Sequence, residues 1–456
     1  MNGRICKAAR ALAGMTQADL AKAANVAKQT VADFERGART PYPNNLAAIR
    51  RALESAGVVF IIGAGETPGV RWRGPGGGEV KPARASRQPG GGGTAATAAS
   101  FEIHYSRFLD PSGRPVQPLP EFARDPAALI PLYRAMVLTR RFDAKAVALQ
   151  RTGRLGTFAS SLGQEAVGVG LASAMRPEDV LFPTYREAGA QLCRGVTLEE
   201  LFVYWGGDER GSDFSGPRQD FPVCIPVAGQ APHAVGVAYA MKLRREPRAA
   251  VCVIGDGATS KGDFYEALNF AGAWQVPAVF VINNNQWAIS LPRTAQTAAQ
   301  TLAQKAIAAG IDGAQVDGDD VIAVRHAVAE ALHKARAGGG PSVIEALTYR
   351  LSDHATADDA TRYRDAEMVS AHWRTDPIAR LRAFLGNAGA WSKDDEEHLI
   401  GEIDARIDAA VQAYEATPAQ PPQAMFDCLY AELPKALAEQ RATASRESGG
   451  KGGEDA

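Results

Sequence analysis

The 456-residue sequence has little of what marks secreted, zinc-binding or membrane proteins. Its five cysteines are scattered, with no CxxC pair and no metal-ligand spacing, so neither a disulfide framework nor a zinc site is expected. No apolar run approaches the ~20 residues that span a bilayer. The amino terminus lacks the charged segment and long apolar core of a signal peptide. We therefore expect a cytoplasmic protein without membrane contact.

Two common phosphate-binding signatures are also missing. The chain contains no GxxxxGK[ST] and no GxGxxG after a predicted strand, which argues against a P-loop and against a Rossmann dinucleotide site. The composition, 46% hydrophobic and 22% charged, is that of a globular protein long enough for two or three domains.

Charge and low-complexity segments divide the chain. Residues 1–100 carry 14 Lys+Arg and 6 Asp+Glu, a net +8, whereas residues 101–456 carry 36 and 45, a net −9. Residues 74–100, "GPGGGEVKPARASRQPGGGGTAATAAS", have the composition of a flexible linker. We predict a head at 1–73, a linker at 74–100, a main domain at 101–444 and a disordered tail at 445–456.

The stretch from Val251 to Trp287, "VCVIGDGATSKGDFYEALNFAGAWQVPAVFVINNNQW", predicts a strand-helix-strand unit. The apolar runs at 249–254 and 278–282 are typical of buried parallel strands, and the segment between them has helical periodicity. Asp256 and Asn285 then follow the carboxyl ends of two strands, where open α/β sheets bind ligands.

The residue types at these two strand ends predict phosphate and magnesium. Gly255 and Gly257 flank Asp256 and allow backbone to approach a bulky anion. A carboxylate and an amide oxygen are ligands that Mg²⁺ takes when phosphate oxygens fill much of its shell. The alternative is a surface turn, for which glycine-flanked aspartates are common. The 29-residue interval to Asn285, filled by a helix and a strand, favours the binding site.

GDG followed after such an interval by NN resembles the diphosphate-binding motif of thiamine-diphosphate enzymes. The wider sequence, about 101–437, resembles the alpha subunit of the decarboxylating component of 2-oxo-acid dehydrogenase complexes, most of all the bacterial pyruvate dehydrogenase form. The matching segments include "LYRAMVLTRRFDAKAVALQRTGRLGTFASSLGQEAVGVG", "FPTYREAGAQLCRG" and "IEALTYRLSDHATADDATRYR". The resemblance implies an α/β thiamine-diphosphate-binding fold, a parallel sheet flanked by helices.

The resemblance also implies a role for ten residues. Magnesium would be held by Asp256, Asn285 and the backbone carbonyl of Trp287. The diphosphate would be contacted by Tyr185, Arg186, Gly257 and Ala258. The planar guanidinium group of Arg186 suits bidentate contact with it. Ile225 and Val227 would wall the aminopyrimidine, and His354, which can titrate near neutral pH, would order its loop over the cofactor and assist acyl transfer. Lys261 stands where relatives often carry Glu or Gln, so its effect on cofactor affinity is open, and Ala355 replaces a serine that regulated relatives phosphorylate.

The implied reaction is decarboxylation of a 2-oxo acid on thiamine diphosphate and transfer of the acyl group to a lipoyl arm of the complex's acyltransferase core. The glutamate that activates the aminopyrimidine belongs to a separate beta subunit in this family, so an α2β2 heterotetramer is expected. Branched-chain 2-oxo-acid and acetoin enzymes remain alternatives, because pockets differing by a few methylenes discriminate by only ~1–3 kcal/mol. A regulator with a retired enzyme domain as its sensor is the alternative from another class.

The head contains "MTQADLAKAANVAKQTVADFERGARTP", two short helical patterns around a turn. It resembles the helix-turn-helix of Cro/repressor-like regulators over roughly residues 5–62, which implies a small all-α domain. Lys28, Gln29 and Thr30 would then face bases, and Gln17 and Arg36 phosphates. The alternative is a small helical bundle with a solvated basic face.

Alpha subunits of this family ordinarily begin near the equivalent of Phe101. The extra head therefore indicates either a bifunctional, DNA-associated enzyme or a gene fusion or misread start that leaves catalysis untouched.

Overall fold

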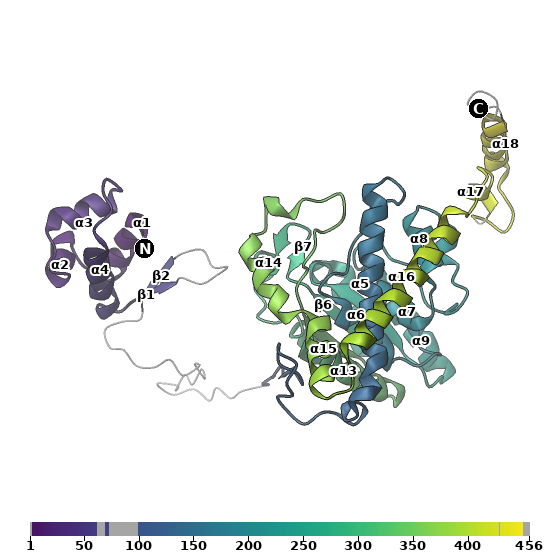
Figure 1. Ribbon diagram of the computed structural model, residues 1–456, viewed down its shortest axis with the longest axis horizontal. Coiled ribbons are helices and arrows are strands. Elements are labelled where there is room, and N and C mark those ends of the chain that lie inside the picture. Colours follow the sequence, from purple (N-terminus) through teal and green to yellow (C-terminus); the bar gives the residue numbers. More distant parts are fainter. Residues whose placement is uncertain (1, 62–68, 73–98, 428, 450–456) are drawn as a thin grey trace. The chain divides into compact units, whose positions relative to one another are not determined.

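The computed structural model describes residues 2–61, 69–72, 99–427 and 429–449 (Figure 1). The chain divides into two compact units, Met1–Ser100 and Phe101–Ala456. The predicted linker, apart from residues 99 and 100, lies outside the described residues, as do residues 450–456 of the predicted tail.

The larger unit is built on a six-stranded sheet in which every strand pair is parallel. In spatial order its strands are β3 (Tyr105–Ser106), β9 (Asp312–Asp317), β10 (Ser342–Leu347), β6 (Ala278–Asn284), β5 (Ala250–Gly255) and β4 (Val180–Phe182). Val251 pairs with Val279, and Val281 with Ile344. Because the strands are parallel, their carboxyl ends meet at one edge of the sheet.

Both faces of the sheet are covered, which explains the unbroken apolar runs of its strands. Val251 and Val253 belong to one core cluster, whereas Cys252 and Ile254 belong to the other, as the two-residue period of a strand requires. The first cluster is completed by α5 (Ile130–Arg151), α6 (Glu165–Ala174), α7 (Ala188–Arg194), α8 (Leu198–Trp205), α13 (Val321–Arg336), α15 (Pro377–Asn387) and α16 (Lys393–Glu415). The second is completed by α9 (Gln230–Arg244), α10 (Gly262–Trp274) and α12 (Lys305–Ala308).

The predicted strand-helix-strand unit is confirmed as β5–α10–β6. Phe264 and Leu268 of α10 are buried against the sheet, while Phe270 and Trp274 lie on its outer side with 44% and 41% of their surface exposed. Asp256 directly follows β5 and Asn285 directly follows β6. Both therefore lie at the carboxyl edge of adjacent strands.

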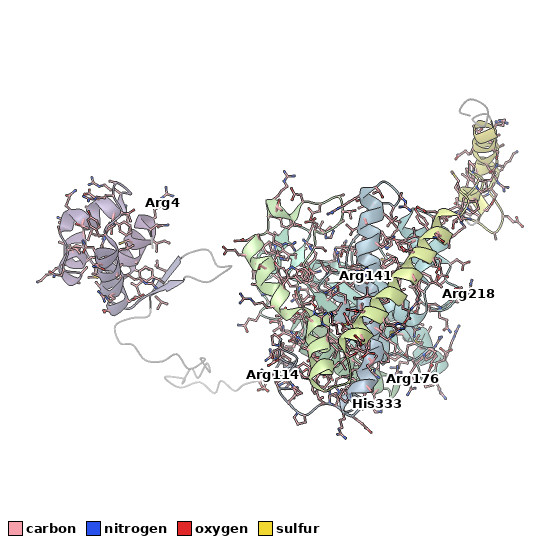
Figure 2. All side chains as sticks on the ribbon, viewed as in Figure 1. Arg4, Arg114, Arg141, Arg176, Arg218 and His333 are labelled. Atoms are coloured by element: carbon pink, nitrogen blue, oxygen red, sulfur yellow. The ribbon has the colours of Figure 1, made fainter. Side chains whose placement is uncertain are left out.

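Helix α16 packs against α5 (Figure 1), the helix that carries Arg141, which is labelled in Figure 2. Arg141 pairs with Asp404, and Lys145 donates to Asp408 over 2.7 Å. Exposed pairs of this kind contribute only about 0–1 kcal/mol each. The buried Ile403 and Ile407 of α16 hold the helix in place by apolar contact.

The remaining helices of this unit are short, apart from α18 (Lys435–Gly449). They are α11 (Arg293–Gln296), α14 (Ala366–His372) and α17 (Ala424–Asp427), with a ribbon of β7 (Trp287–Ala288) and β8 (Leu291–Pro292). The prediction of disorder from residue 445 is wrong for 445–449, which are helical. The alanines, leucine and charged residues of "KALAEQRATASRES" are good helix formers and carry the helix past that point.

The smaller unit contains α1 (Gly3–Leu12), α2 (Gln17–Ala23), α3 (Lys28–Glu35) and α4 (Pro43–Ser55). Thr16 caps α2 in a reciprocal capping box with Asp19. Leu20, Val31 and Phe34 are buried in its core. The helical part agrees with the predicted helix-turn-helix, and an antiparallel pair that the sequence did not predict, β1 (Val58–Ile61) with β2 (Gly69–Trp72), follows it. In the part of the chain described, no helix has the length and apolarity to cross a membrane.

Candidate active site

A cavity of about 230 Å³ opens at the carboxyl edge of the sheet. Its walls come from the segments that follow β4, β5, β6 and β10, and from residues just before α6 and α9. Every residue that the sequence singled out for the site lines it: Tyr185, Arg186, Ile225, Val227, Asp256, Gly257, Ala258, Asn285, Trp287 and His354. The structure thus brings together residues that lie up to 169 positions apart in the chain.

Asp256 is the charged group at the floor of this cavity. Its side chain is 2% exposed, and its Oδ2 has no hydrogen-bond partner among the described residues. Burial raises the pKa of Asp256 to about 6, an effect that the charges of Arg350 and Arg186 oppose. A buried carboxylate oxygen without a donor is costly unless a cation or donor reaches it. This arrangement fits a cation ligand.

Asn285 and residues of the loop after it form another part of the cavity wall. The Asn285 Oδ1 accepts from the Trp287 N–H over 3.1 Å, and its Nδ2 donates to Gln164 Oε1 over 2.9 Å. Gln286 and Ile289 have φ of 72° and 55°, in the left-handed region. For a β-branched residue such as Ile289 this conformation is strained, and such strain clusters at functional sites.

The donor set fits magnesium bound together with a phosphate group. Among the described residues, no three His, Cys, Asp or Glu side chains converge on one point. A metal site made only of such side chains is therefore excluded for this part of the chain. Asp256, the Asn285 amide and a backbone carbonyl would supply part of a shell of hard oxygens, and phosphate oxygens and water commonly complete the octahedron of Mg²⁺.

Gly257 packs tightly against Ala288, a residue of the loop after Asn285. A Cβ at Gly257 would lie 2.7 Å from the Ala288 Cβ, so no larger residue fits without a shift. Gly255 has open space instead. Lys261 does not line the cavity; its Nζ lies 3.9 Å from Asp263, and its side chain is 53% exposed. Any influence of Lys261 on the site is therefore long-range.

His354 sits between two arginines. Arg186 Nη2 lies 3.2 Å from its Nδ1, and Arg350 Nη1 lies 3.3 Å from the same atom. Because both partners can only donate, Nδ1 accepts, and a neutral ring carries its proton on Nε2. Burial, then the two guanidinium charges, lower the pKa of His354 to about 4. At this pKa the imidazole is a neutral N–H donor near pH 7, where a free histidine would titrate.

The loop that carries His354 is fixed by residues that sequence reasoning did not single out. Asp358 Oδ2 accepts from the His354 N–H over 2.9 Å and from the Tyr363 hydroxyl. Arg350, whose side chain is fully buried, donates to that same hydroxyl over 2.9 Å. Arg364 donates to the Arg350 carbonyl. Their only sequence signal was their place in the "YRLSDHATADDATRYR" segment.

Sequence reasoning also missed about half of the cavity lining. These residues are Gln164, Thr184, Glu187, Cys224, Ala228, Gln230, Asn283, Ala288 and Ile289. Asn283 was visible as the first of three asparagines, whereas Gln164 reaches the site from a segment 121 residues before Asn285 and carries no local signal. Arg186 also binds this distant segment, since its Nη1 donates to the Ser160 carbonyl over 2.6 Å.

The mouth of the cavity is apolar and exposed. Ile225, Val227 and Ile289 line it with 53%, 49% and 56% of their surfaces accessible. Apolar side chains of this size gathered beside a polar pocket are typical of a surface that a ligand or another protein covers.

An α/β protein with a parallel sheet and a cavity at the carboxyl edge of its strands belongs to the class whose ligand sites lie at strand ends. The chain belongs to the dehydrogenase E1 component family, whose model matches residues 133–423. A helix-turn-helix family model matches residues 7–56.

Two groups of relatives are similar over most of the chain. The pyruvate dehydrogenase E1 component subunit alpha of Staphylococcus aureus is 41% identical over 347 residues, which cover 75% of this chain and 93% of that protein. The 3-methyl-2-oxobutanoate dehydrogenase subunit alpha of Mycobacterium tuberculosis is 41% identical over 362 residues, which cover 78% of this chain and 96% of that protein. Sequence identity to these relatives therefore does not decide between pyruvate and 3-methyl-2-oxobutanoate as the substrate of this chain.

Proposed function

We propose that the chain is the alpha subunit of a thiamine-diphosphate-dependent pyruvate dehydrogenase of the acetyl-transferring type. The observation that carries the proposal is the convergence of Asp256, Asn285 and Arg186 on one cavity, with His354 beside them. A retired enzyme domain used as a sensor has no need to keep a buried, unpaired carboxylate and a strained loop, because both cost stability. Intact machinery supports an enzyme.

Each residue has a distinct task in this proposal. Asp256, Asn285 and the Trp287 carbonyl would hold magnesium, and the backbone at Gly257 and Ala258 would contact the diphosphate. When bound, thiamine diphosphate supplies the electron sink for decarboxylation. Arg186 would bind a diphosphate oxygen, and the neutral His354 would donate from Nε2 to an oxygen of the ligand or substrate. Ile225 and Val227 would wall the aminopyrimidine and exclude water from the reacting end once a partner subunit covers them.

The partners follow from the same site. We propose a beta subunit over the apolar mouth, giving an α2β2 heterotetramer, and a lipoyl-bearing acyltransferase core as acceptor of the acetyl group. The four cysteines in the described residues are free thiols, which fits a cytoplasmic location.

Pyruvate is the proposed substrate. The assembled alpha and beta subunits are expected to turn over pyruvate with a higher kcat/KM than 3-methyl-2-oxobutanoate, by about 10-fold or more, since one or two methylenes are worth ~1–3 kcal/mol. The measurement is reduction of an artificial electron acceptor with each acid in turn. A higher kcat/KM for the branched acid would replace pyruvate by the branched-chain assignment and leave the reaction type intact.

We further propose that residues 1–73 bind DNA through α3. Lys28 and Gln29 are exposed there, and Thr30 is half-buried. Gln29 and Arg36 both donate to Asp33, over 2.8 and 2.6 Å, so this face is pre-ordered. Gln17 donates to the buried Glu35, which also binds Arg10. The network sets the angle between α2 and α3, as a groove-reading pair requires.

DNA affinity of the full-length chain is expected to fall steeply with salt, because phosphate contacts release counterions. The double variant Lys28→Ala/Gln29→Ala should flatten any sequence preference, whereas Arg50→Ala, which removes a charge on α4, should leave the preference intact. Fluorescence anisotropy over a salt series measures both effects. Absence of binding to every duplex at 50 mM salt would overturn the DNA proposal, and unchanged enzyme turnover after deletion of residues 1–100 would establish independent units.

A further inference from the structure

Gln164 has no part in the roles described so far, yet it is built into the cavity wall. It is the residue immediately before α6, its side chain is 2% exposed, and its Oε1 accepts from Asn285 Nδ2 over 2.9 Å. Because Asn285 must donate there, its carbonyl oxygen faces away from Gln164. That oxygen has a second lone pair beyond the one used by Trp287 N–H.

The other end of the Gln164 amide is unpaired. Its Nε2 is buried and has no hydrogen-bond partner in the described part of the chain. Four other buried atoms of cavity-lining residues share this property: Asp256 Oδ2, Asn283 Oδ1, Gln230 Oε1 and Trp287 Nε1. Three of these five atoms are acceptors, and the two donors are Gln164 Nε2 and Trp287 Nε1. An unpaired buried amide costs roughly 1–3 kcal/mol, so such a donor is expected to meet an acceptor when the cavity is filled.

The backbone of Gln164 is held rigidly. Its N–H donates to the Ser161 carbonyl over 2.8 Å. Gly163 has φ of 88°, and a Cβ there would lie 2.6 Å from the Tyr349 carbonyl oxygen. The Gly163 N–H donates to Glu165, and the Gly163 carbonyl accepts from Thr348, over 3.0 and 2.8 Å. The side chain is therefore aimed by a fixed turn.

We propose that Gln164 is a binding and positioning residue of the metal-diphosphate site. Its Oε1 fixes the Asn285 amide so that the carbonyl oxygen serves the cation. Its Nε2 donates to an anionic oxygen of the diphosphate, or to a water held by the cation. The inference rests on the proposed function, because it assigns a role at that same site.

Two variants separate the halves of this role. Gln164→Glu keeps an acceptor for Asn285 and replaces the donor by a carboxylate oxygen, whereas Gln164→Met removes both. Gln191→Met is the matched control, since Gln191 is 4% exposed, has an unpaired Nε2 and does not line the cavity. All three are made in the full-length chain and probed by calorimetry and Mn²⁺ electron paramagnetic resonance, with MnCl₂ alone and with inorganic diphosphate.

Gln164→Glu is expected to retain the Mn²⁺ signal without diphosphate and to lose about 10- to 100-fold of the affinity for Mn²⁺-diphosphate, the range seen when groups supporting a metal ligand are removed. Gln164→Met should weaken both, and Gln191→Met neither. Wild-type affinity in both Gln164 variants, or equal losses in Gln191→Met, would overturn the inference. Failure of the wild-type chain to bind Mn²⁺-diphosphate would instead overturn the proposed function, and the inference with it.

Discussion

The purified chain by itself should release no carbon dioxide from pyruvate, with thiamine diphosphate and magnesium at saturating concentrations, and should gain full activity when a beta subunit is added. We expect background carbon dioxide release from the chain alone and full turnover from the mixture with the beta subunit. Assay of the chain alone, the beta subunit alone and the mixture measures it, and sedimentation shows whether the active species is the α2β2 heterotetramer.

The physical reason lies in the open side of the cavity. Ile225, Val227 and Ile289 are about half exposed at its mouth, so a ligand's aminopyrimidine end would remain in contact with water. Electrostatic and proton-transfer steps need a closed, water-poor site. We therefore expect this chain to bind the charged end of the cofactor and a second protein to cover the apolar end.

If the chain proves active without a beta subunit, Glu187 is the residue to test. It is the single glutamate among the described residues that line the cavity, and it accepts from the Thr184 N–H over 2.7 Å and from the Thr184 hydroxyl. These hydrogen bonds hold the Glu187 carboxylate to its own loop, next to Arg186. Activity of the lone chain that disappears in Glu187→Gln would show that Glu187 activates the cofactor and that no partner glutamate is needed.

Asp256→Ala should abolish magnesium-dependent binding of thiamine diphosphate without unfolding the protein. Even groups that only orient a metal ligand cost 10- to 100-fold in affinity when removed, so loss of the one charged ligand is expected to exceed about 100-fold. Calorimetry of the chain with beta subunit, cofactor and MgCl₂ measures the affinity. The Tm without cofactor should stay level or rise, because the variant no longer buries a carboxylate whose Oδ2 is unpaired.

Asp263→Ala is the matched control. Asp263 lies seven residues further on, in the first turn of α10, is half exposed and does not line the cavity. Its loss should leave cofactor affinity unchanged. Asp256→Asn, which keeps an oxygen and removes the charge, should bind with intermediate affinity. Wild-type affinity in Asp256→Ala would remove the central claim about the cation site.

Local pattern was enough for the parts of the fold in which neighbours in sequence are neighbours in space. The apolar runs of β5 and β6 and the periodic segment of α10 predicted the unit that places Asp256 and Asn285. The capping threonine of α2 and the buried face of α3 are likewise local signals. The interpretation missed the pair β1 with β2, and it took the chain as disordered from residue 445, although residues 445–449 belong to α18.

The sequence by itself therefore determined the class of the fold, the two strand ends of the site and the family, because glycine turns, apolar runs and motif spacing are properties of consecutive residues. Only the tertiary structure decided how the site is completed. Gln164 binding Asn285, and Arg186 and Arg350 enclosing His354, are contacts between segments far apart in the chain. The protonation of His354 followed from that enclosure, since burial and two nearby positive charges lower its pKa, and no stretch of sequence around one histidine contains either cause.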